Sequence, residues 1–294
     1  MVYLREMISI ICLLFFSITF LSSDVIARQD NIMADSWLSQ KCNSEVIIFC
    51  EDFEGGISNW LTDNGDVNLV KDAKKLDTSN TILELRTYQG RNSSKLIRAF
   101  DDQELVYVRY EVRYALDYVN EGGSHGPVLG GAVNPPWGLL GKAGIKPSGH
   151  DHFTLNYEPI GIIGKGGEFG LYAYYVNMRP TNSGKYWGVV YKTNHPGKAV
   201  ITPGEWHCVE YGLRLNTQDD SRDGMAWFWF NGLLVGAVSG IQWRIDTSFG
   251  INTFVLDSYN HFRTRVKSKA SPNRVQYDNI VVSRLPVGCE ESEK

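Results

Sequence analysis

The chain lacks most of the patterns that mark common classes of enzyme. Its one Gly-x-Ser-x-Gly match, residues 122–126, leads into Pro127 and not into a helix, so it is no nucleophile elbow, and no phosphate-binding glycine loop occurs. It also lacks the Glu-x-Asp-x-x-Glu strand motif that would place two catalytic carboxylates on one face, as retaining glycoside hydrolysis requires. Amphipathic helical periodicity is nearly absent after the first 27 residues. These absences argue against serine-hydrolase, nucleotide-dependent and retaining-glucanase chemistry, and against a helical fold.

An excess of positive charge is missing too. The chain has 29 lysines and arginines against 33 aspartates and glutamates, for a formal net charge of −4. Broad nucleic-acid binding needs a basic face, so we expect no nucleic-acid partner. No internal repeat, low-complexity tract or linker breaks the sequence, which favours a single domain.

Residues 1–27 are predicted to be an export signal peptide. Arg5 gives a short charged start, an apolar run follows from Ile8 to Leu21, and residues 25–27 are small or apolar. The alternative is an uncleaved membrane anchor, but this run is short for a bilayer span, and no later segment is apolar enough. We therefore expect a secreted or periplasmic protein without membrane contact after signal removal. Residues 28–41 are expected to be a flexible N-terminal segment and residues 290–294 a C-terminal tail.

Four of the five cysteines remain after removal of the signal: Cys42, Cys50, Cys208 and Cys289. No CxxC spacing occurs among them, which disfavours a zinc or redox site. An even count in an exported chain predicts disulfides, and four cysteines allow three pairings. We expect Cys42 to pair with Cys289 and Cys50 with Cys208, because terminal strands of a sandwich often lie side by side. The alternative is that one or both pairs remain buried thiols.

Short alternating runs, broken by Gly, Pro, Asn and Asp, dominate residues 42–289. Aromatic residues make up 12% of the chain, and strands favour them. Regular short strands with turn signals predict an all-β sandwich or barrel. The strands are expected at 46–53, 67–70, 82–87, 95–98, 105–114, 152–157, 170–176, 206–215, 225–238, 252–256 and 275–283.

The stretch from residue 206 to residue 236 carries the strongest local signal. Two alternating apolar runs flank a polar turn with Asp223-Gly224, and Asn231-Gly232 follows. Both dipeptides tolerate the positive φ angles of tight hairpins, so we predict two successive hairpins. By contrast, the glycine- and proline-rich residues 121–149 are predicted to form a long irregular loop, and such loops are often functional.

Alternation also predicts which side chains share a face. Val108, Tyr110, Val112 and Tyr114 are expected in the core, which leaves Arg109, Glu111 and Arg113 on the opposite face. In the same way Phe153, Leu155 and Tyr157 oppose His152, Thr154 and Asn156, and Tyr172 and Tyr174 share one face of their strand.

Several of these segments together resemble the concanavalin A-like jelly-roll proteins, and among them polysaccharide lyase family 14 with its alginate and glucuronan lyases. The resemblance spans about residues 46–285 in the order of the family. It is carried by Phe49–Gly55, Val106–Tyr110, the Gly122-Gly123 loop ending in Leu129-Gly130-Gly131, Gly167-Glu168, Tyr172-Ala173-Tyr174, Trp206–Gly232 and Tyr277–Ser283. It implies an all-β jelly-roll sandwich of two antiparallel sheets, acting on a polysaccharide, with no cofactor required.

The resemblance also implies site residues. A polyuronate lyase must neutralise the uronate carboxylate, place a base at the adjacent ring proton and protonate the leaving oxygen. Tyr172 and Tyr174 match the two tyrosines of the family and are expected to act as base and acid. Where the family has a lysine, this chain has Ser124 and His125, and where it has a serine and an arginine, Thr154 and Asn156.

We therefore expect catalysis by Tyr172, Tyr174, His125 and Asn156, and substrate binding by Arg109, Arg113, His152, Thr154 and His261. Trp137, Trp187 and Trp243 are candidates for stacking on sugar rings. Acidic side chains of the terminal strands, among them Glu54 and Asp278, would suit a structural calcium ion. The expected function is cleavage of an acidic polysaccharide by β-elimination. The alternative, favoured by the absence of the lysine and the arginine, is a non-catalytic, lectin-like carbohydrate-binding module.

Overall fold

The computed structural model describes residues 38, 41–63, 65–72, 80–88, 90–121, 123–261 and 272–289. The chain divides into two units, Met1–Asn43 and Ser44–Lys294, and the second carries every strand of the described part. The predicted signal peptide, the C-terminal tail and most of the predicted N-terminal segment lie outside the described residues. Within them, no helix has the length and apolar character needed to cross a membrane.

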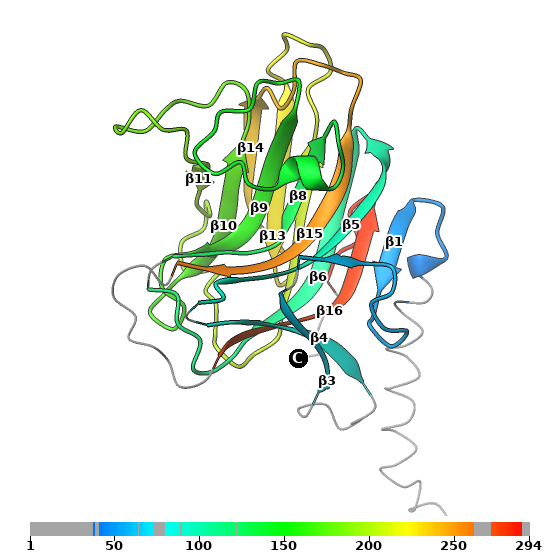
Figure 1. Ribbon diagram of the computed structural model, residues 1–294, viewed down its shortest axis with the longest axis vertical. Coiled ribbons are helices and arrows are strands. Elements are labelled where there is room, and N and C mark those ends of the chain that lie inside the picture. Colours follow the sequence, from blue (N-terminus) through cyan, green and yellow to red (C-terminus); the bar gives the residue numbers. More distant parts are fainter. Residues whose placement is uncertain are drawn as a thin grey trace, which may run out of the picture. The chain divides into compact units, whose positions relative to one another are not determined.

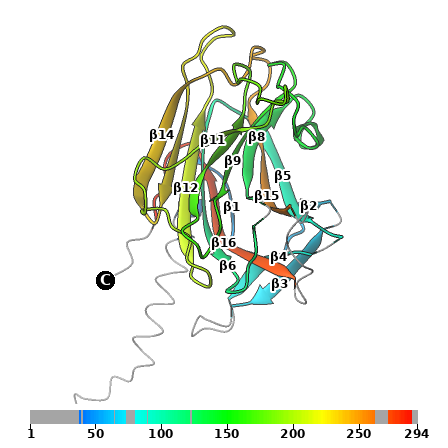
Figure 2. The same cartoon turned by 90° about the vertical axis from the view of Figure 1, so that its left-hand side faces the viewer.

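The second unit is a sandwich of two antiparallel sheets, which confirms the predicted all-β jelly-roll class. The first sheet has the order β14-β13-β12-β6-β16-β4-β3, with β1 beside β16, and the second β11-β10-β9-β8-β15-β5-β2, with β7 beside β15. Figure 1 shows β9, β8 and β15 side by side in the second sheet. Figure 2, turned by 90°, shows β12 and β14 in one layer and β8 and β15 in the other.

The strands of the first sheet are β1 (Ile47–Glu51), β3 (Asp66–Lys71), β4 (Thr81–Thr87), β6 (Leu105–Tyr114), β12 (His207–Arg214), β13 (Gly224–Phe230), β14 (Leu233–Ile241) and β16 (Asn273–Ser283). Those of the second are β2 (Leu61–Thr62), β5 (Ser93–Gln103), β7 (Ser124–His125), β8 (Val128–Ala132), β9 (His152–Ile160), β10 (Glu168–Tyr174), β11 (Val189–Tyr191) and β15 (Ile251–Asn260). The short 3-10 helix η1 (Trp137–Leu139) follows β8.

The core lies between the inner faces of the two sheets and confirms the predicted alternation. Val108, Tyr110, Val112 and Tyr114 of β6 face Phe153, Leu155 and Tyr157 of β9 within one buried apolar cluster. Tyr157 also joins the layers by a polar contact, since its hydroxyl donates to the carbonyl oxygen of Trp229 on β13 at 2.9 Å. The even-numbered residues of β9 therefore point away from the core, among them the predicted site residues His152, Thr154 and Asn156.

One of the two predicted hairpin turns is confirmed and the other is not. Asn231 and Gly232, with φ of 47° and 81°, join β13 to β14 in a tight turn. Asp223 and Gly224 do not form such a turn, because Gly224 already begins β13 and nine residues, 215–223, join it to β12. The Asp223 carboxylate instead accepts hydrogen bonds from Thr217 and Ser221 and closes this wider loop.

The prediction of one irregular loop over residues 121–149 is wrong in part, because β7 and β8 lie within it. β8 is an inner strand that pairs with both β9 and β15. The sequence did not predict β8 because this strand contains Gly130 and Gly131, and glycine has a low strand propensity. Here they are required: a Cβ on Gly131 would lie 2.1 Å from the carbonyl oxygen of Gly250 and 2.6 Å from the ring of Phe153.

The predicted disulfide pairings are wrong. Cys208, on β12, is bonded to Cys289 near the C-terminus, with 5.9 Å between the two Cα atoms. Cys42 and Cys50 are disulfide-bonded as well, so the expectation that all four cysteines are oxidised is confirmed. The predicted pairing was wrong because the C-terminal segment returns to β12, the strand that carries Cys208. There the backbone amides of Val287 and Gly288 donate to the carboxylate of Glu210. β12 lies four strands away from β3, which is at one edge of the first sheet.

Candidate active site

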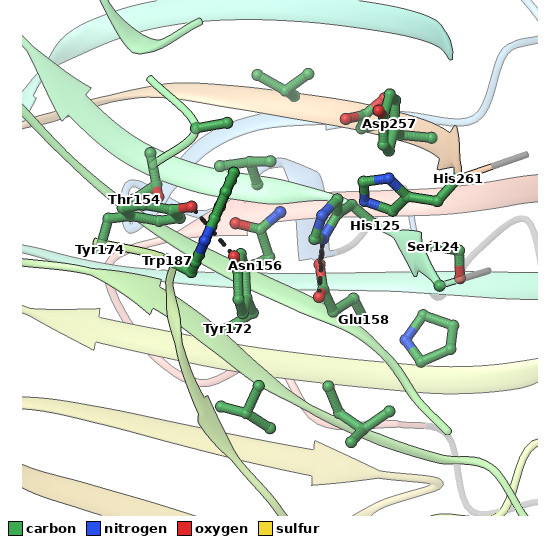
Figure 3. A pocket seen from close by; sticks show the side chains of 18 of the residues that line it. Ser124, His125, Thr154, Asn156, Glu158, Tyr172, Tyr174, Trp187, Asp257 and His261 are labelled. Atoms are coloured by element: carbon green, nitrogen blue, oxygen red, sulfur yellow. Dashed lines mark hydrogen bonds and ion pairs between the residues drawn. The ribbon is translucent and has the colours of Figure 1, made fainter. Parts of the chain in front are cut away.

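A cleft of about 840 Å³ opens on the outer face of the second sheet. Its floor comes from β9, β10 and β15, and its rim from the segments around Gly123, Leu140 and Trp187. Most of the predicted catalytic and binding residues line it, namely His125, Thr154, Asn156, Tyr172, Tyr174 and His261, and Ser124 lines it as well. Figure 3 shows these side chains gathered in one pocket although they come from four separate segments of the chain.

Tyr172 and Tyr174 lie on the cleft face of β10. Register places Tyr172 opposite Asn156 and Tyr174 opposite Thr154 on β9, so the four side chains form two cross-strand pairs. The two phenolic oxygens are 3.1 Å apart, and the backbone amide of Gly188 donates to the hydroxyl of Tyr172 at 2.9 Å. Burial and the hydrogen bond with Tyr174 raise the pKa of Tyr172 well above its usual range. Tyr172 is therefore a neutral phenol at ordinary pH, suited to donate a proton.

His125, on β7, is held against Tyr172 by a buried carboxylate. Its ring stacks on Tyr172 with centroids 5.0 Å apart and on Tyr259 at 5.7 Å. The Nδ1 atom of His125 lies 3.0 and 2.9 Å from the two carboxylate oxygens of Glu158. Burial alone would lower the pKa of His125, but the charge and hydrogen bond of Glu158 outweigh it and raise the pKa. The imidazolium form is thus stabilised, and Nε2 is the nitrogen that can serve a ligand.

Glu158 belongs to the floor of the cleft and was not among the predicted site residues. Its side chain is only 4% exposed. Burial raises its pKa, and the charge of His125 with hydrogen bonds from Gly126 and Asn156 offsets part of that rise. The signal that could have found it is alternation, because Glu158 follows His152, Thr154 and Asn156 on the same face of one strand.

A second pair of opposite charges lines the same cleft and was also missed. Nζ of Lys95, on β5, lies 3.5 Å from Asp257 on β15 and 3.3 Å from Asp63. Burial raises the pKa of Asp257 to about 6, although the charges of Lys95 and His125 oppose this. Burial lowers the pKa of Lys95, but the charges of Asp257 and Asp63 together raise it by more, so that the net shift is upward. No sequence motif links these three residues, which only the sheet brings together.

Arg109 and Arg113, which were predicted to bind substrate, both lie on β6 of the other sheet and outside the cleft. Arg109 forms an ion pair with Glu111 at 2.9 Å and donates to the carbonyl oxygen of Asn279. Arg113 lies 2.8 Å from the buried carboxylate of Asp72 and stacks over the ring of Trp206. Alternation correctly placed them on the outer face, but it could not tell which of the two sheets bends around the cleft.

The two predicted histidines differ. His261 lines the cleft, with its ring 5.4 Å from that of His125 and 4.7 Å from that of Tyr259. His152 is fully buried and does not line the cleft. Its Nδ1 atom lies 2.8 Å from Oδ2 of Asp151. Burial lowers the pKa of His152 despite that carboxylate, so the ring is neutral at ordinary pH. The prediction that His152 binds substrate is therefore not supported by its position.

The residues predicted to bind calcium have hydrogen-bond partners within the protein. Glu54 accepts hydrogen bonds from the backbone amide and the hydroxyl of Thr81, and Asp278 from Asn80 and the amide of Asn279. Across the part of the chain that the structure describes, no three His, Cys, Asp or Glu side chains are grouped so that they could hold a metal ion.

Of the three tryptophans considered for stacking, Trp243 is fully buried, Trp137 is exposed outside the cleft, and Trp187 lines the cleft.

Similar proteins are found by structure and not by sequence. No family model matches the chain, and no curated protein matches it by sequence. Solved structures do match. A marine alginate lyase of polysaccharide lyase family 14 from Aplysia kurodai has a TM-score of 0.59 at 12% identity, over 81% of this chain and 99% of that one. An alginate lyase from Chlorella virus has a TM-score of 0.58 at 14% identity, over 81% and 100%.

An endo-β-1,4-glucuronan lyase from the fungus Trichoderma reesei gives a TM-score of 0.55 at 18% identity, over 81% of this chain and 96% of that one. At such identities the likeness concerns the fold. The chain thus has the jelly-roll architecture of the alginate and glucuronan lyases, as its sequence motifs predicted.

Proposed function

We propose that this chain is an exported polysaccharide lyase that cleaves an acidic polysaccharide by β-elimination. The observation that carries the proposal is the pair of tyrosine hydroxyls 3.1 Å apart in one cleft, with the ring of His125 stacked on Tyr172. Two phenols and an imidazole within one cleft can supply a base, an acid and a hydrogen-bond donor for a carboxylate. The disulfides support folding in an oxidising compartment.

In this reaction a base removes the ring proton next to the uronate carboxyl group. The electrons of that C–H bond form a carbon–carbon double bond, the bond to the glycosidic oxygen breaks, and that oxygen takes up a proton. Tyr172 suits the donor, because its raised pKa keeps it protonated. Tyr174 then suits the base, and the Nε2 atom of His125 the carboxyl group of the substrate. Asn156 supports the site from the floor, since its side chain helps to hold Glu158.

The structural neighbours support the same substrate class. The lyases of similar fold act on alginate or glucuronan, which are acidic polysaccharides, and one of them was solved with an alginate tetrasaccharide. Such chains are long and flexible, and a cleft that is open on the surface of a sheet can accept them in mid-chain.

The runner-up is a non-catalytic carbohydrate-binding protein, and the pairing of the cations in the cleft favours it. His125 is matched by Glu158, and Lys95 by Asp257 and Asp63. Where the lyase resemblance expects a lysine and an arginine, this site has a paired imidazole and the neutral Asn156. A binder needs hydrogen bonds and apolar contacts but no uncompensated positive charge.

The test is a double variant, Tyr172→Phe with Tyr174→Phe, which keeps the rings and removes both hydroxyls. Formation of unsaturated uronate is followed by its absorbance near ~235 nm on alginate and glucuronan, with neutral glucans for comparison, and rates are read as changes in transition-state stabilisation. Tyr191→Phe is the matched control, because its hydroxyl also pairs with a tyrosine, Tyr175, at 2.7 Å, but outside the cleft.

We expect turnover by the wild-type protein and by Tyr191→Phe, and loss of about a hundredfold or more in the double variant, the scale of a lost general acid–base group. Unchanged turnover in the double variant would reject these roles. Saturable binding of the polysaccharides without any turnover would reject the lyase and select the binding protein.

A further inference from the structure

Trp187 stands at the rim of the cleft with much of its indole exposed. It is 45% exposed and lines the cleft together with Tyr172 and Tyr174, as Figure 3 shows. Large aromatic side chains normally bury their rings, as Trp243 does in this protein. An indole left open beside the candidate reacting groups is a surface that a ligand can cover.

The backbone on both sides of Trp187 is held by hydrogen bonds, and its ring lies close to Gly144. The next residue, Gly188, donates its backbone amide to the hydroxyl of Tyr172 at 2.9 Å. The preceding residue, Tyr186, forms a bridge with Gly144 and donates to its carbonyl oxygen at 3.3 Å. A Cβ on Gly144 would lie 3.4 to 3.7 Å from the indole, so the ring rests against the backbone of that glycine. The backbone that carries Trp187 therefore needs little ordering when a ligand binds.

An open aromatic face selects sugars by their stereochemistry. A pyranose ring with axial hydrogens on C1, C3 and C5 presents an apolar C–H face that packs on an indole, whereas axial hydroxyls break up such a face. β-D-Glucuronate and β-D-mannuronate have this face, and α-L-guluronate, in its preferred chair, does not. Contact of this kind adds apolar burial and dispersion without requiring charge, which suits a cleft whose described cations are paired.

We propose that Trp187 forms a sugar-stacking subsite next to the tyrosine pair and that it selects β-linked D-uronates of glucuronan or mannuronan type over α-L-guluronate. The proposal deepens the proposed function, on which it rests, by naming the substrate class of the same cleft. The anchor through Gly188 ties the stacked sugar to the position of the Tyr172 hydroxyl. Stacking thus sets the register of the chain relative to the reacting groups.

The experiment measures binding by calorimetry in the Tyr174→Phe background, which removes the proposed base so that turnover does not consume the ligand, and keeps the Tyr172 hydroxyl that anchors Gly188. The probes are saturated oligosaccharides of equal length: β-linked mannuronate, β-linked glucuronate and α-L-guluronate. The variants are Trp187→Ala, Trp187→Phe as the conservative rescue, and Trp137→Ala as the matched control. Trp137 is 54% exposed on η1 and does not line the cleft.

We expect the β-linked oligosaccharides to bind at least about tenfold more tightly than guluronate, and Trp187→Ala to remove about that factor, the scale of one aromatic contact. Trp187→Phe should keep part of the preference and Trp137→Ala all of it. Equal affinity for the three probes, or a loss in Trp187→Ala that is equal for all three or no larger than in Trp137→Ala, would overturn the proposal. Trp187-dependent preference in a protein without turnover would instead overturn the lyase and leave the stacking subsite standing.

Discussion

The Nδ1 atom of His125 on β7 lies 2.9 Å from Oε2 of Glu158 on β9, and the carboxylate is almost completely buried. The two residues are 33 positions apart, and the strands that carry them both adjoin the cleft. A buried carboxylate that contacts one ring nitrogen fixes both the orientation and the charge of the imidazole. Within the proposed function we therefore assign Glu158 the role of a positioning residue, which acts through His125.

Replacing Glu158 by Gln should lower the pKa of His125. In the wild-type protein that pKa is raised, so the imidazolium persists above the ordinary value, whereas burial without the carboxylate favours the neutral ring. The measurement is an NMR titration of the His125 ring, together with binding of an acidic oligosaccharide against pH. Binding that needs the positive charge should fall as the pH rises through the pKa of His125, and it should do so at lower pH in the variant.

The same shift predicts a stability effect with a definite sign. The pKa of His125 in the folded protein exceeds the unfolded value of about 6.5, so its contribution is fully present below that value and is lost as the pH rises through the folded-state pKa. Glu121→Gln is the control, because Glu121 also lines the cleft but pairs with Lys165 on the surface. An unchanged titration of His125 in Glu158→Gln would contradict the role assigned to Glu158.

Adding one methyl group at Gly131 should destabilise the second sheet. A Cβ there would lie 2.1 Å from the carbonyl oxygen of Gly250, and backbone cannot give way as a flexible side chain can. We expect Gly131→Ala to lower the free energy of unfolding by about 3 kcal/mol, at the upper end of overpacking effects. Urea unfolding measures this. Gly55→Ala, where no atom lies within 4 Å of the added Cβ, should change stability by far less, and equal effects at the two sites would refute the explanation.

Removing the disulfide between Cys208 and Cys289 should also cost stability. The two residues are 81 positions apart, and restoring the freedom of an unfolded loop of that length costs about 4.5 kcal/mol in the chain-entropy account. The paired variant Cys208→Ala/Cys289→Ala, compared with the wild-type protein in guanidinium unfolding under non-reducing conditions, gives the value. A midpoint that does not move would mean that the C-terminal segment is held by its other contacts, such as those with Glu210.

Arg113 provides a test of the corrected assignment of the first sheet. Its guanidinium lies 2.8 Å from Asp72, whose side chain is fully buried. Arg113→Met should lower the free energy of unfolding by about 3 kcal/mol, because loss of one partner leaves the other charge poorly compensated. Binding of acidic oligosaccharides, measured where the variant is still folded, should not change. A selective loss of binding with full stability would restore Arg113 to the substrate site.

The sequence predicted the all-β class and the faces of β6, β9 and β10 through alternation, which reports on burial, and the two-sheet arrangement through the resemblance. It predicted Tyr172, Tyr174, His125, Thr154 and Asn156 as neighbours through the resemblance, and the register of β9 and β10 brings four of them together. It did not reveal β8, whose glycines have low strand propensity but are demanded by close backbone approach.

The remaining errors concern residues that depend on long-range pairing. The polar faces of β6 and β9 look alike in the sequence, yet only that of β9 borders the cleft, so Arg109 and Arg113 were misplaced. Lys95 and Asp257 meet because β5 and β15 pair, with these two residues opposite each other in the register. Such registers are set by the packing of the whole sandwich and leave no local trace in the chain.

Adjacent residues of β9 link the interior of the protein to its cleft. Tyr157 reaches across the sandwich to the backbone of Trp229, and Glu158, the next residue, turns outward to hold His125. The same strand thus packs Tyr157 against the opposite layer and directs Glu158 toward His125. If the proposed function is right, a glycan that enters the cleft meets an imidazole already in place, and most of the freedom of motion lost on binding is that of the sugar chain.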